Sequence, residues 1–377
     1  MADITFGNEA VFKEDVCEYV SIAFLDSTHF VVAYRVNDAN DYGYAVVGSI
    51  SGTTISWGTP LVFNEGATVY VSVAALDSTH FVVAYNDQPG NNDVVCKVGV
   101  TSGTTISSYG AANIADSDNT NYTSIAALDS THFVVVYGDA GNSNKGTAIV
   151  GVVSGTTISS YGSASVFSGT NYIFYPAVTA LDSTHFVVAY KDGDDPKDGT
   201  AIIGLTSGTT ISSFGTAVSF NSGDTREMSV VALDSTHFVV AYKDDEGDDY
   251  GIARVGVTSG TAISSFGSEN IFNSANTRYT SVTALDSTHF AVAYKDDGGD
   301  DYGGTRVGTV SGTTISGYTD EELFNSAVTD YISVAALDDS NFVIAFKDTG
   351  NSSYGTGILG TYTAPASAST GNFFQLF

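Results

Sequence analysis

The residue types that could carry out chemistry in this sequence lie together in a short segment, Leu-Asp-Ser-Thr-His-Phe, first found at residues 25–30. Serine, histidine and aspartate are the residues of a hydrolytic catalytic triad, in which each occupies a separate position around the substrate. Asp26, Ser27 and His29 share one tight stretch of chain, which does not allow that geometry. Aspartate, serine and threonine also bond the backbone of turns. We therefore interpret the segment as a turn.

This segment returns along the whole chain. Identical copies begin at Leu76, Leu128, Leu181, Leu233 and Leu285, and an altered seventh copy lies at 337–342. The aspartates of successive copies are 51, 52, 53, 52, 52 and 52 residues apart. A near-constant period of this length predicts one array of repeated units instead of two or three domains. The six histidines of the copies could form a pH-sensitive ring on one face.

Carboxylates gather in a second recurring place, the loop that follows the apolar run after each histidine. The loops at 192–198, 244–249 and 296–301 set many aspartates beside glycines. Calcium takes six to eight oxygen ligands of this kind, although the spacing matches no established calcium loop and solvated acidic turns are common. Calcium is therefore a candidate cofactor, and the candidate ligands are Asp192, Asp194, Asp198, Asp244, Asp248, Asp296 and Asp300.

One position, six residues before the leucine of each copy, is aromatic in six of the seven repeats and is Glu227 in the fifth. If the repeats surround a channel, these side chains circle one of its mouths, where aromatic rings form a platform for sugars or small apolar groups. Packing between neighbouring repeats is the alternative role. The aromatic residues are Tyr19, Tyr70, Tyr122, Tyr175, Tyr279 and Tyr331.

The fourth repeat departs most from the common pattern. Residues 172–176 read Tyr-Ile-Phe-Tyr-Pro, and the proline removes a backbone donor from its strand. Arg226 and Arg278 lie on neighbouring links between repeats, so this region is the preferred place for a specific ligand contact. The candidate ligand-binding residues are Tyr19, Tyr70, Tyr122, Tyr172, Phe174, Tyr175, Arg226, Glu227, Arg278, Tyr279 and Tyr331.

Each repeat has the pattern of four short antiparallel strands. In residues 278–327, a run rich in β-branched side chains leads into the Asp-Ser-Thr-His turn, as in a β-hairpin. The run after the turn is almost wholly apolar, as expected of a strand that is buried on both faces. No segment shows a sustained helical period. The four predicted strands of this repeat lie at 278–285, 290–295, 302–310 and 313–324.

The two ends of the chain indicate how the array closes. A fourth-strand motif, Ser-Gly-Thr-(Thr/Ala)-Ile-Ser, occurs six times, and the seventh repeat stops after its third strand, near Tyr362. The missing strand is found at the N-terminus, where residues 4–7 (Ile-Thr-Phe-Gly) match residues 55–58 (Ile-Ser-Trp-Gly). We therefore expect residues 3–13 to pair with the last repeat, at 330–362, and to complete a ring.

On this pattern the chain resembles the seven-bladed β-propellers over residues 3–362. The resemblance implies an all-β fold with four antiparallel strands in each blade, closed by the N-terminal strand, and a single domain over residues 1–362. The blade has no Trp-Asp dipeptide, no paired glycines of the kelch kind, no Asp-box and no complete Asp-x-Asp-x-Asp-Gly loop. In the style of its near-identical repeats it is similar to propellers of environmental bacteria and their viruses.

The composition narrows the classes of partner. Asp and Glu number 42 against 13 Lys and Arg, a formal charge of −29, so nucleic acids and anionic membranes would be repelled. The charge suits divalent cations or basic partners, and it also keeps a large particle soluble. Cys17 and Cys96 lie at different places in different repeats, so no disulfide framework or zinc cluster is expected. No apolar run reaches the length of a membrane span.

Three classes of function are compatible with this pattern. We expect a non-enzymatic binding or adhesion module that recognises a surface ligand, such as a glycan, within a virus particle or cell-surface assembly. A purely structural, decorating subunit is the alternative, and a glycosidase or lyase is the third class, indicated only by Glu227 and the two arginines. Residues 363–377 read as a spacer and an apolar hook, which either folds back under the repeats or, as we prefer, docks into the assembly. Without a signal-peptide pattern, we expect an extracellular or virion-associated protein, with a cytoplasmic location still open.

Overall fold

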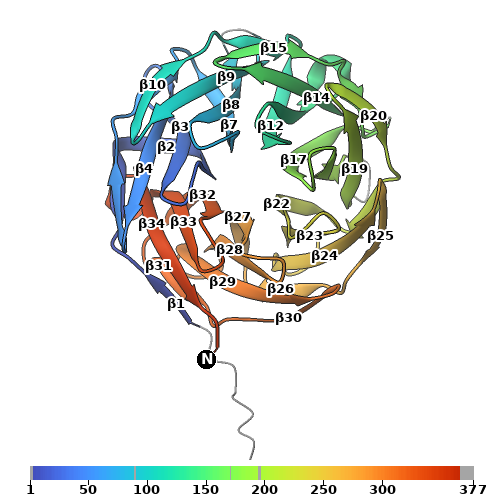
Figure 1. Ribbon diagram of the computed structural model, residues 1–377. Coiled ribbons are helices and arrows are strands. Elements are labelled where there is room, and N and C mark those ends of the chain that lie inside the picture. The colour runs from blue at the N-terminus through green and yellow to red at the C-terminus, as the bar shows by residue number, and fades with distance from the viewer. Residues whose placement is uncertain (1–2, 89–90, 170, 194–196, 366–377) are drawn as a thin grey trace, which may run out of the picture.

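Repeated four-stranded antiparallel sheets make up the fold. The computed structural model describes residues 3–88, 91–169, 171–193 and 197–365. Figure 1 shows the sheets arranged around a central opening, with the first strand of each repeat nearest to it. Within the described ranges there is no α-helix, and so no helix that could cross a membrane. Two 3-10 turns occur in these ranges, η2 (Ala140–Asn142) and η3 (Thr349–Asn351).

The first two strands of each repeat form a hairpin around the Asp-Ser-Thr-His turn, or around its altered copy in the seventh repeat. The first strands are β2 (Ala10–Phe24), β7 (Thr68–Ala75), β12 (Thr120–Ala127), β17 (Ile173–Ala180), β22 (Thr225–Ala232), β27 (Thr277–Ala284) and β32 (Thr329–Ala336). The second strands are β3 (His29–Val36), β8 (His80–Asp87), β13 (His132–Asp139), β18 (His185–Asp192), β23 (His237–Asp244), β28 (His289–Asp296) and β33 (Asn341–Asp348).

The outer part of each sheet contains the third strand, the fourth strand and a short strand that also pairs with the third. The third strands are β4 (Gly43–Ser51), β9 (Asp93–Ser102), β14 (Lys145–Ser154), β19 (Gly199–Ser207), β24 (Gly251–Ser259), β29 (Tyr302–Ser311) and β34 (Tyr354–Thr363). The fourth strands are β5 (Thr54–Trp57), β10 (Thr105–Tyr109), β15 (Thr157–Tyr161), β20 (Thr210–Phe214), β25 (Ala262–Phe266) and β30 (Thr314–Tyr318). The short strands are β6 (Leu61–Asn64), β11 (Asn113–Asp116), β16 (Ser165–Val166), β21 (Val218–Asn221), β26 (Asn270–Asn273) and β31 (Glu322–Asn325).

The second strand of each repeat lies at the centre of the core, because a neighbouring repeat covers each of its faces. In β3, Val31 packs with Val73 of the second repeat, whereas Val32 packs with Val343 of the seventh. Both β3 residues are fully buried. Alternate side chains of a strand point to opposite faces, so a strand covered on both sides must be apolar throughout. This confirms the expectation drawn from the apolar run after each histidine.

The N-terminal residues lie against the last repeat. Strand β1 (Asp3–Phe6) pairs antiparallel with β34, with Ile4 opposite Tyr362. The first residues of β2 continue along the same strand, where Val11 lies opposite Thr356. Because β2 also pairs with β3, the first and last repeats belong to one nine-stranded sheet. The pairing expected of residues 3–13 is therefore observed.

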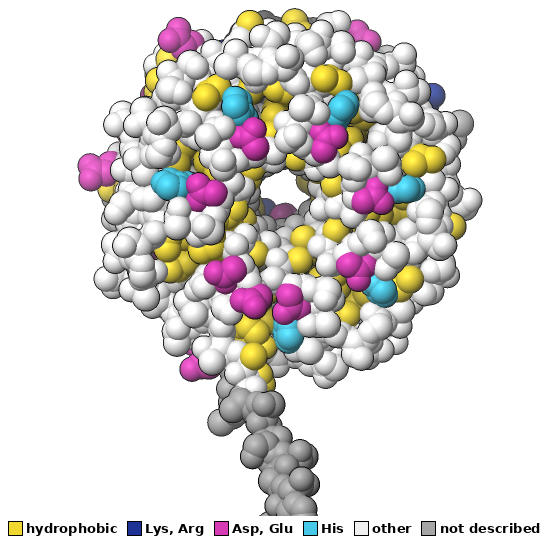
Figure 2. Space-filling view, viewed as in Figure 1, with side chains coloured by type: hydrophobic (Ala, Val, Ile, Leu, Met, Phe, Trp, Pro, Cys, Tyr) yellow, Lys and Arg dark blue, Asp and Glu magenta, His cyan; other side chains and the backbone are white. Residues whose placement is uncertain are grey.

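The two ends of the strands define two faces of the molecule. We call the face that carries the turns between first and second strands the turn face, and the opposite one, which carries the loops between second and third strands, the loop face. All six histidines belong to these turns. Figure 2 shows the turn face, where histidine and acidic side chains lie beside one another around the central opening.

Candidate binding site in the central channel

A residue at the same place in every first strand adopts a left-handed backbone conformation, with φ between 50° and 59°. Residues other than glycine adopt positive φ rarely. The pairing of the first and second strands shifts register at this point, for example between Glu18 and Ser21. The irregularity is a bulge, which redirects one side chain out of the regular alternation. The residues concerned are Tyr19, Tyr70, Tyr122, Tyr175, Glu227, Tyr279 and Tyr331.

The six tyrosines contact one another in an almost complete ring, which we call the tyrosine ring. Neighbouring ring centroids lie 5.0–5.6 Å apart, in tilted or edge-to-face arrangements that aromatic pairs favour. The contacting pairs are Tyr19–Tyr70, Tyr70–Tyr122, Tyr122–Tyr175, Tyr279–Tyr331 and Tyr331–Tyr19. Burial raises the pKa of Tyr70 and of Tyr279 to about 12, so both hydroxyls stay neutral at physiological pH.

Glu227 stands where the tyrosine ring is broken, between Tyr175 and Tyr279. Its Oε2 accepts a hydrogen bond of 3.1 Å from the backbone N–H of Tyr279. Burial raises the pKa of Glu227 above its ordinary value of 4.5, while this hydrogen bond and the charge of Arg278 act in the opposite direction. A smaller, acidic side chain thus replaces a phenol ring at one point of the ring.

A cavity of about 210 Å³ opens at this break. Tyr122 and Tyr175 supply aromatic surface, and the Glu227 carboxylate supplies an acceptor. Thr280 is 8% exposed, and its Oγ1 is buried without a hydrogen-bond partner. A buried hydroxyl without a partner costs free energy. The full lining is Tyr122, Thr123, Tyr175, Pro176, Glu227, Met228 and Thr280.

The other aromatic candidates of the fourth repeat extend the aromatic surface beside this cavity. The ring of Phe174 lies 6.0 Å from Tyr122 and 5.5 Å from Tyr172. Tyr172 and Tyr175 are 39% and 38% exposed, a large fraction for aromatic side chains. The segment that departs from the repeat pattern therefore offers exposed aromatic surface next to the cavity, although neither Tyr172 nor Phe174 lines it.

The two candidate arginines lie near the cavity without lining it. Arg226 Nε pairs with Asp245 at 2.8 Å, which holds its guanidinium at the acidic loop of its own repeat. The guanidinium of Arg278 lies 5.4 Å from the ring centroid of Tyr279, a cation–π contact. Both side chains therefore flank the site and balance the charge of Glu227.

The candidate calcium ligands are not brought together. Within the part of the chain that the structure describes, no group of three or more His, Cys, Asp or Glu could hold a metal ion. Asn side chains donate to Asp192, Asp244 and Asp296, and Asp194 lies outside the described residues. Asp198, Asp248 and Asp300 join no such group either. The calcium prediction thus finds no support in the described loops.

The sequence analysis missed a set of largely buried cations that pair with carboxylates of the acidic loops. A lysine or arginine ends the second strand in five repeats and pairs with nearby carboxylates. Lys243 Nζ, for example, lies 2.7 Å from Asp245 and 3.1 Å from Asp249. Lys295 contacts Asp330 of the next repeat at 3.3 Å. The sequence Tyr-Lys-Asp, which recurs at the end of the second strand, could have indicated these cations. The five residues are Arg35, Lys191, Lys243, Lys295 and Lys347.

On the turn face, Asp26 and His29 form the local network expected of a turn. Asp26 Oδ1 accepts hydrogen bonds from the backbone N–H groups of Thr28 and His29, and Asp26 Oδ2 lies 3.0 Å from Nδ1 of His29. No serine of the described chain is hydrogen-bonded to these histidines. The arrangement is therefore an aspartate-stabilised turn and not a triad.

Comparisons with known proteins identify the fold of this chain but assign it to no family. No protein-family model matches the sequence, and no curated protein matches it. Among solved structures, the BP39L lectin from Burkholderia pseudomallei has a TM-score of 0.67 at 9% identity, with 94% of this chain and 99% of that chain covered. The fold is that of a β-propeller.

Two further structures agree with this propeller fold. A protein of unknown function from Dyadobacter fermentans has a TM-score of 0.54 at 11% identity, and covers 96% of this chain and 99% of its own. AofleA from Arthrobotrys oligospora has a TM-score of 0.51 at 9% identity, with 85% and 90% covered. Identities this low show a shared fold alone.

Proposed function

We propose that the seven repeats are the blades of a closed seven-bladed propeller, in which β1 supplies the fourth strand of the last blade. Contacts at the junction of the chain ends support this. A Cβ on Gly58 would lie 1.9 Å from the carbonyl oxygen of Thr104 in the next repeat, so only glycine fits there. Gly7 at the N-terminus has the same relation to Thr53, at 2.4 Å. The N-terminal strand thus makes the contact that an ordinary fourth strand makes.

The ring so formed is proposed to be a non-enzymatic carbohydrate-binding module, with its ligand in the cavity at Glu227. The observation that carries this proposal is the single break in the tyrosine ring. It creates a site with aromatic walls and one carboxylate, with Thr280 also in its lining. Concave sites with mostly apolar walls and a few convergent polar groups are the usual form of small-molecule sites.

Carbohydrate is the ligand class that fits these groups best. A sugar ring has an apolar C–H face, which can lie against Tyr122 or Tyr175, and hydroxyl groups that can donate to the Glu227 carboxylate. Hydrogen bonds to a charged acceptor are stronger than those between neutral groups. The formal charge of −29 disfavours polyanionic ligands. The likeness to a lectin supports the same class without deciding it.

A binding role, without cleavage, follows from the number of carboxylates. Glycoside hydrolysis generally needs two, about 5–9.5 Å apart. Glu227 is the one carboxylate among the residues that line this cavity, all of which belong to the described chain. We therefore propose that the protein holds a glycan and does not hydrolyse it, and that the glycosidase and lyase alternatives lack a second acid–base group.

The context of this binding is part of the same proposal. A module of this kind would act outside the cell or on a virus particle, attached to a larger assembly through the turn face and residues 363–377, of which 366–377 lie outside the described residues. A decorating subunit that recognises nothing is the competing function. Both functions predict that the protein co-purifies with the particle or surface fraction. A binding assay on the purified protein is therefore needed to distinguish a binding module from a decorating subunit.

A glycan array tests the proposal most directly, with the full chain compared with Glu227→Tyr and Glu227→Gln. Tyrosine occupies this backbone conformation in six other repeats, so Glu227→Tyr should complete the ring and fill the cavity without disturbing the fold. We expect saturable binding by the wild-type chain, roughly tenfold weaker binding by Glu227→Gln, and none by Glu227→Tyr. Equal binding by all three chains would contradict a channel site, and no binding by the wild-type chain would favour the decorating role.

A further inference from the structure

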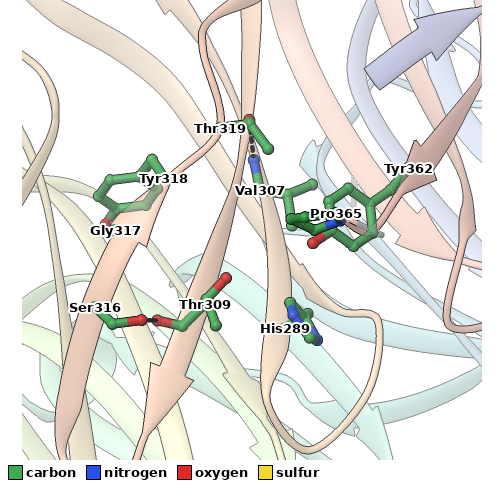
Figure 3. Close-up of a pocket in the computed structure, with 9 residues that line it drawn as sticks. All are labelled: His289, Val307, Thr309, Ser316, Gly317, Tyr318, Thr319, Tyr362 and Pro365. Carbon is green, nitrogen blue, oxygen red and sulfur yellow. Dashed lines mark hydrogen bonds between the residues drawn. The ribbon is translucent and has the colours of Figure 1, made fainter. Parts of the chain in front are cut away.

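A second cavity, of about 340 Å³, lies at the junction of the sixth and seventh repeats. We call it the seam cavity. It is far from the tyrosine ring in the fold, because the histidine turns and the tyrosine bulges lie at opposite ends of the first strands. Figure 3 shows its lining side chains, which come from the outer strands of the sixth repeat, from His289 and from the end of β34. They are His289, Val307, Thr309, Ser316, Gly317, Tyr318, Thr319, Tyr362 and Pro365.

A glycine contact that is found at the other junctions is absent beside the seam cavity. At those junctions a glycine lies so close to a threonine carbonyl of the next repeat that a Cβ would come within 1.8–2.4 Å, as between Gly110 and Thr156. At this junction the corresponding residues are Thr319 and Pro365, which need more room. Gly317 also stands where other repeats have serine, so one wall lacks a side chain. All three residues line the seam cavity, so its wall differs in composition from the equivalent surface of the other junctions.

The walls of the seam cavity offer apolar rings and uncharged polar groups. The ring centroids of His289 and Tyr362 lie 5.5 Å apart, and Pro365 adds a further apolar surface. Asp286 Oδ2 lies 2.8 Å from Nδ1 of His289, which leaves Nε2 of the same ring for another partner. Ser316 Oγ donates to the carbonyl of Thr309, so its lone pairs remain for a donor. None of the lining residues is an aspartate, glutamate, lysine or arginine.

Two smaller cavities lie beside the histidine turns of other junctions and share two lining positions with the seam cavity. One, of about 180 Å³, includes His80 and Val153, and the other, of about 320 Å³, includes His237 and Val310. The valines stand at the repeat position of Tyr362. The seam cavity therefore has the same histidine as its relatives, plus an aromatic ring in place of an aliphatic side chain.

We propose that the seam cavity binds one uncharged saccharide unit, packed against Pro365 and hydrogen-bonded by Nε2 of His289, with the largely buried Tyr362 as part of the cavity wall. The cavity volume lies at the lower end of the range of about 300–1,000 Å³ for small-molecule sites. The inference shares its ligand class with the proposed function and rests on different residues, on the turn face. A chain with both sites holds one glycan in its channel and another at the junction of two repeats on the turn face, which favours attachment to branched or surface-bound glycans through avidity.

Histidine-selective NMR tests this inference, since every histidine of the chain lies in a turn of this kind. The protein is labelled with ¹³C at the histidine Cε1 position and titrated with the methyl glycosides of glucose, galactose, mannose and N-acetylglucosamine. Each is added to about 50 mM, enough to occupy sites with millimolar dissociation constants. We expect one glycoside to shift the His289 signal saturably, with smaller shifts at His80 and His237.

The sequence itself supplies matched variants. His289→Asn assigns the signal and should abolish the site while keeping the turn, because Asn341 makes the same contact with Asp338 in the seventh repeat. Tyr362→Val restores the valine of the smaller cavities and should weaken binding roughly fivefold, from the loss of the aromatic part of the cavity wall.

Two outcomes overturn the inference. One is that all four glycosides leave the His289 signal unchanged. The other is that Glu227→Tyr removes the shift, which would show that the signal reports on a ligand in the channel. A shift that persists in Glu227→Tyr supports the seam cavity even if the array experiment finds no channel binding, so the two proposals can fail separately.

Discussion

Glu227 Oε2 accepts a 3.1 Å hydrogen bond from the backbone N–H of Tyr279, although the two residues are 52 positions apart in the chain. The bond joins equivalent positions of neighbouring repeats, each with a φ near 50°. It holds the carboxylate at the break in the tyrosine ring, beside the cavity that also contains Thr280. The channel thus differs from a uniform ring at one position, where Glu227 replaces the tyrosine of the other repeats.

Ligand binding at Glu227 should depend on pH. Burial raises the folded-state pKa of this carboxyl above 4.5, so the acid stays protonated over a range of pH above that value. Protonation replaces a charged acceptor with a neutral one. Hydrogen bonds to the charged acceptor are stronger by about 1–2 kcal/mol. We expect affinity to rise roughly tenfold between pH 4.5 and neutral pH. Calorimetric titration at several pH values measures it, and Glu227→Gln should show a flat profile. A flat wild-type profile would contradict a role for the carboxylate.

Protonation of the aspartates in the Asp-Ser-Thr-His turns should destabilise the fold at low pH. Burial acts to raise the pKa of Asp129, but hydrogen bonds from Thr131 and His132 outweigh it and lower the pKa to about 2. Because this folded-state pKa lies below the ordinary 3.8, the stability it contributes is present above that pH and is lost as the pH falls toward 2. Asp129→Asn should therefore lower the melting temperature at pH 7 and have little effect at pH 2. Ser130→Ala, in the same turn, should have little effect at either pH.

The N-terminal strand should contribute as much stability as an internal fourth strand. Ile4 is 3% exposed and Ile55, its counterpart in the first repeat, is 6% exposed. Replacement of either by alanine should cost about 2–5 kcal/mol of unfolding free energy, as is usual for a buried isoleucine. Denaturant unfolding measures this cost. In limited proteolysis, Ile4→Ala alone should expose the junction of first and last repeats. A negligible cost for Ile4→Ala would be evidence against closure by β1.

Removal of divalent metal should leave both stability and glycan binding unchanged. Several carboxylates of the loop face already pair with cations, as Asp245 and Asp249 do with Lys243. The melting temperature and array binding should be the same with calcium and with chelator. A rise of several degrees with millimolar calcium would instead place a metal site in these loops and restore the calcium hypothesis.

Much of the fold could be predicted because its determinants are local in the chain. The hairpin follows from Asp26 and its turn donors, and the buried second strand follows from an apolar run such as Phe30–Tyr34. The fourth-strand match between residues 4–7 and 55–58 was enough to expect the pairing of β1 with β34. The calcium hypothesis, which no described group of carboxylates supports, illustrates the opposite case. A list of aspartates does not show which of them a lysine from a neighbouring strand already contacts.

The sequence by itself determined the repeat, the four-strand pattern of each unit and the positions where one repeat differs from the others, including Glu227. Only the tertiary structure decided what those differences do, because residues about 52 positions apart meet only when neighbouring repeats pack side by side. The cavity at Glu227 needs residues from the third, fourth, fifth and sixth repeats. The seam cavity needs Thr319 to face Pro365 across a junction. Cavities are spaces left by packing, and no local pattern encodes them.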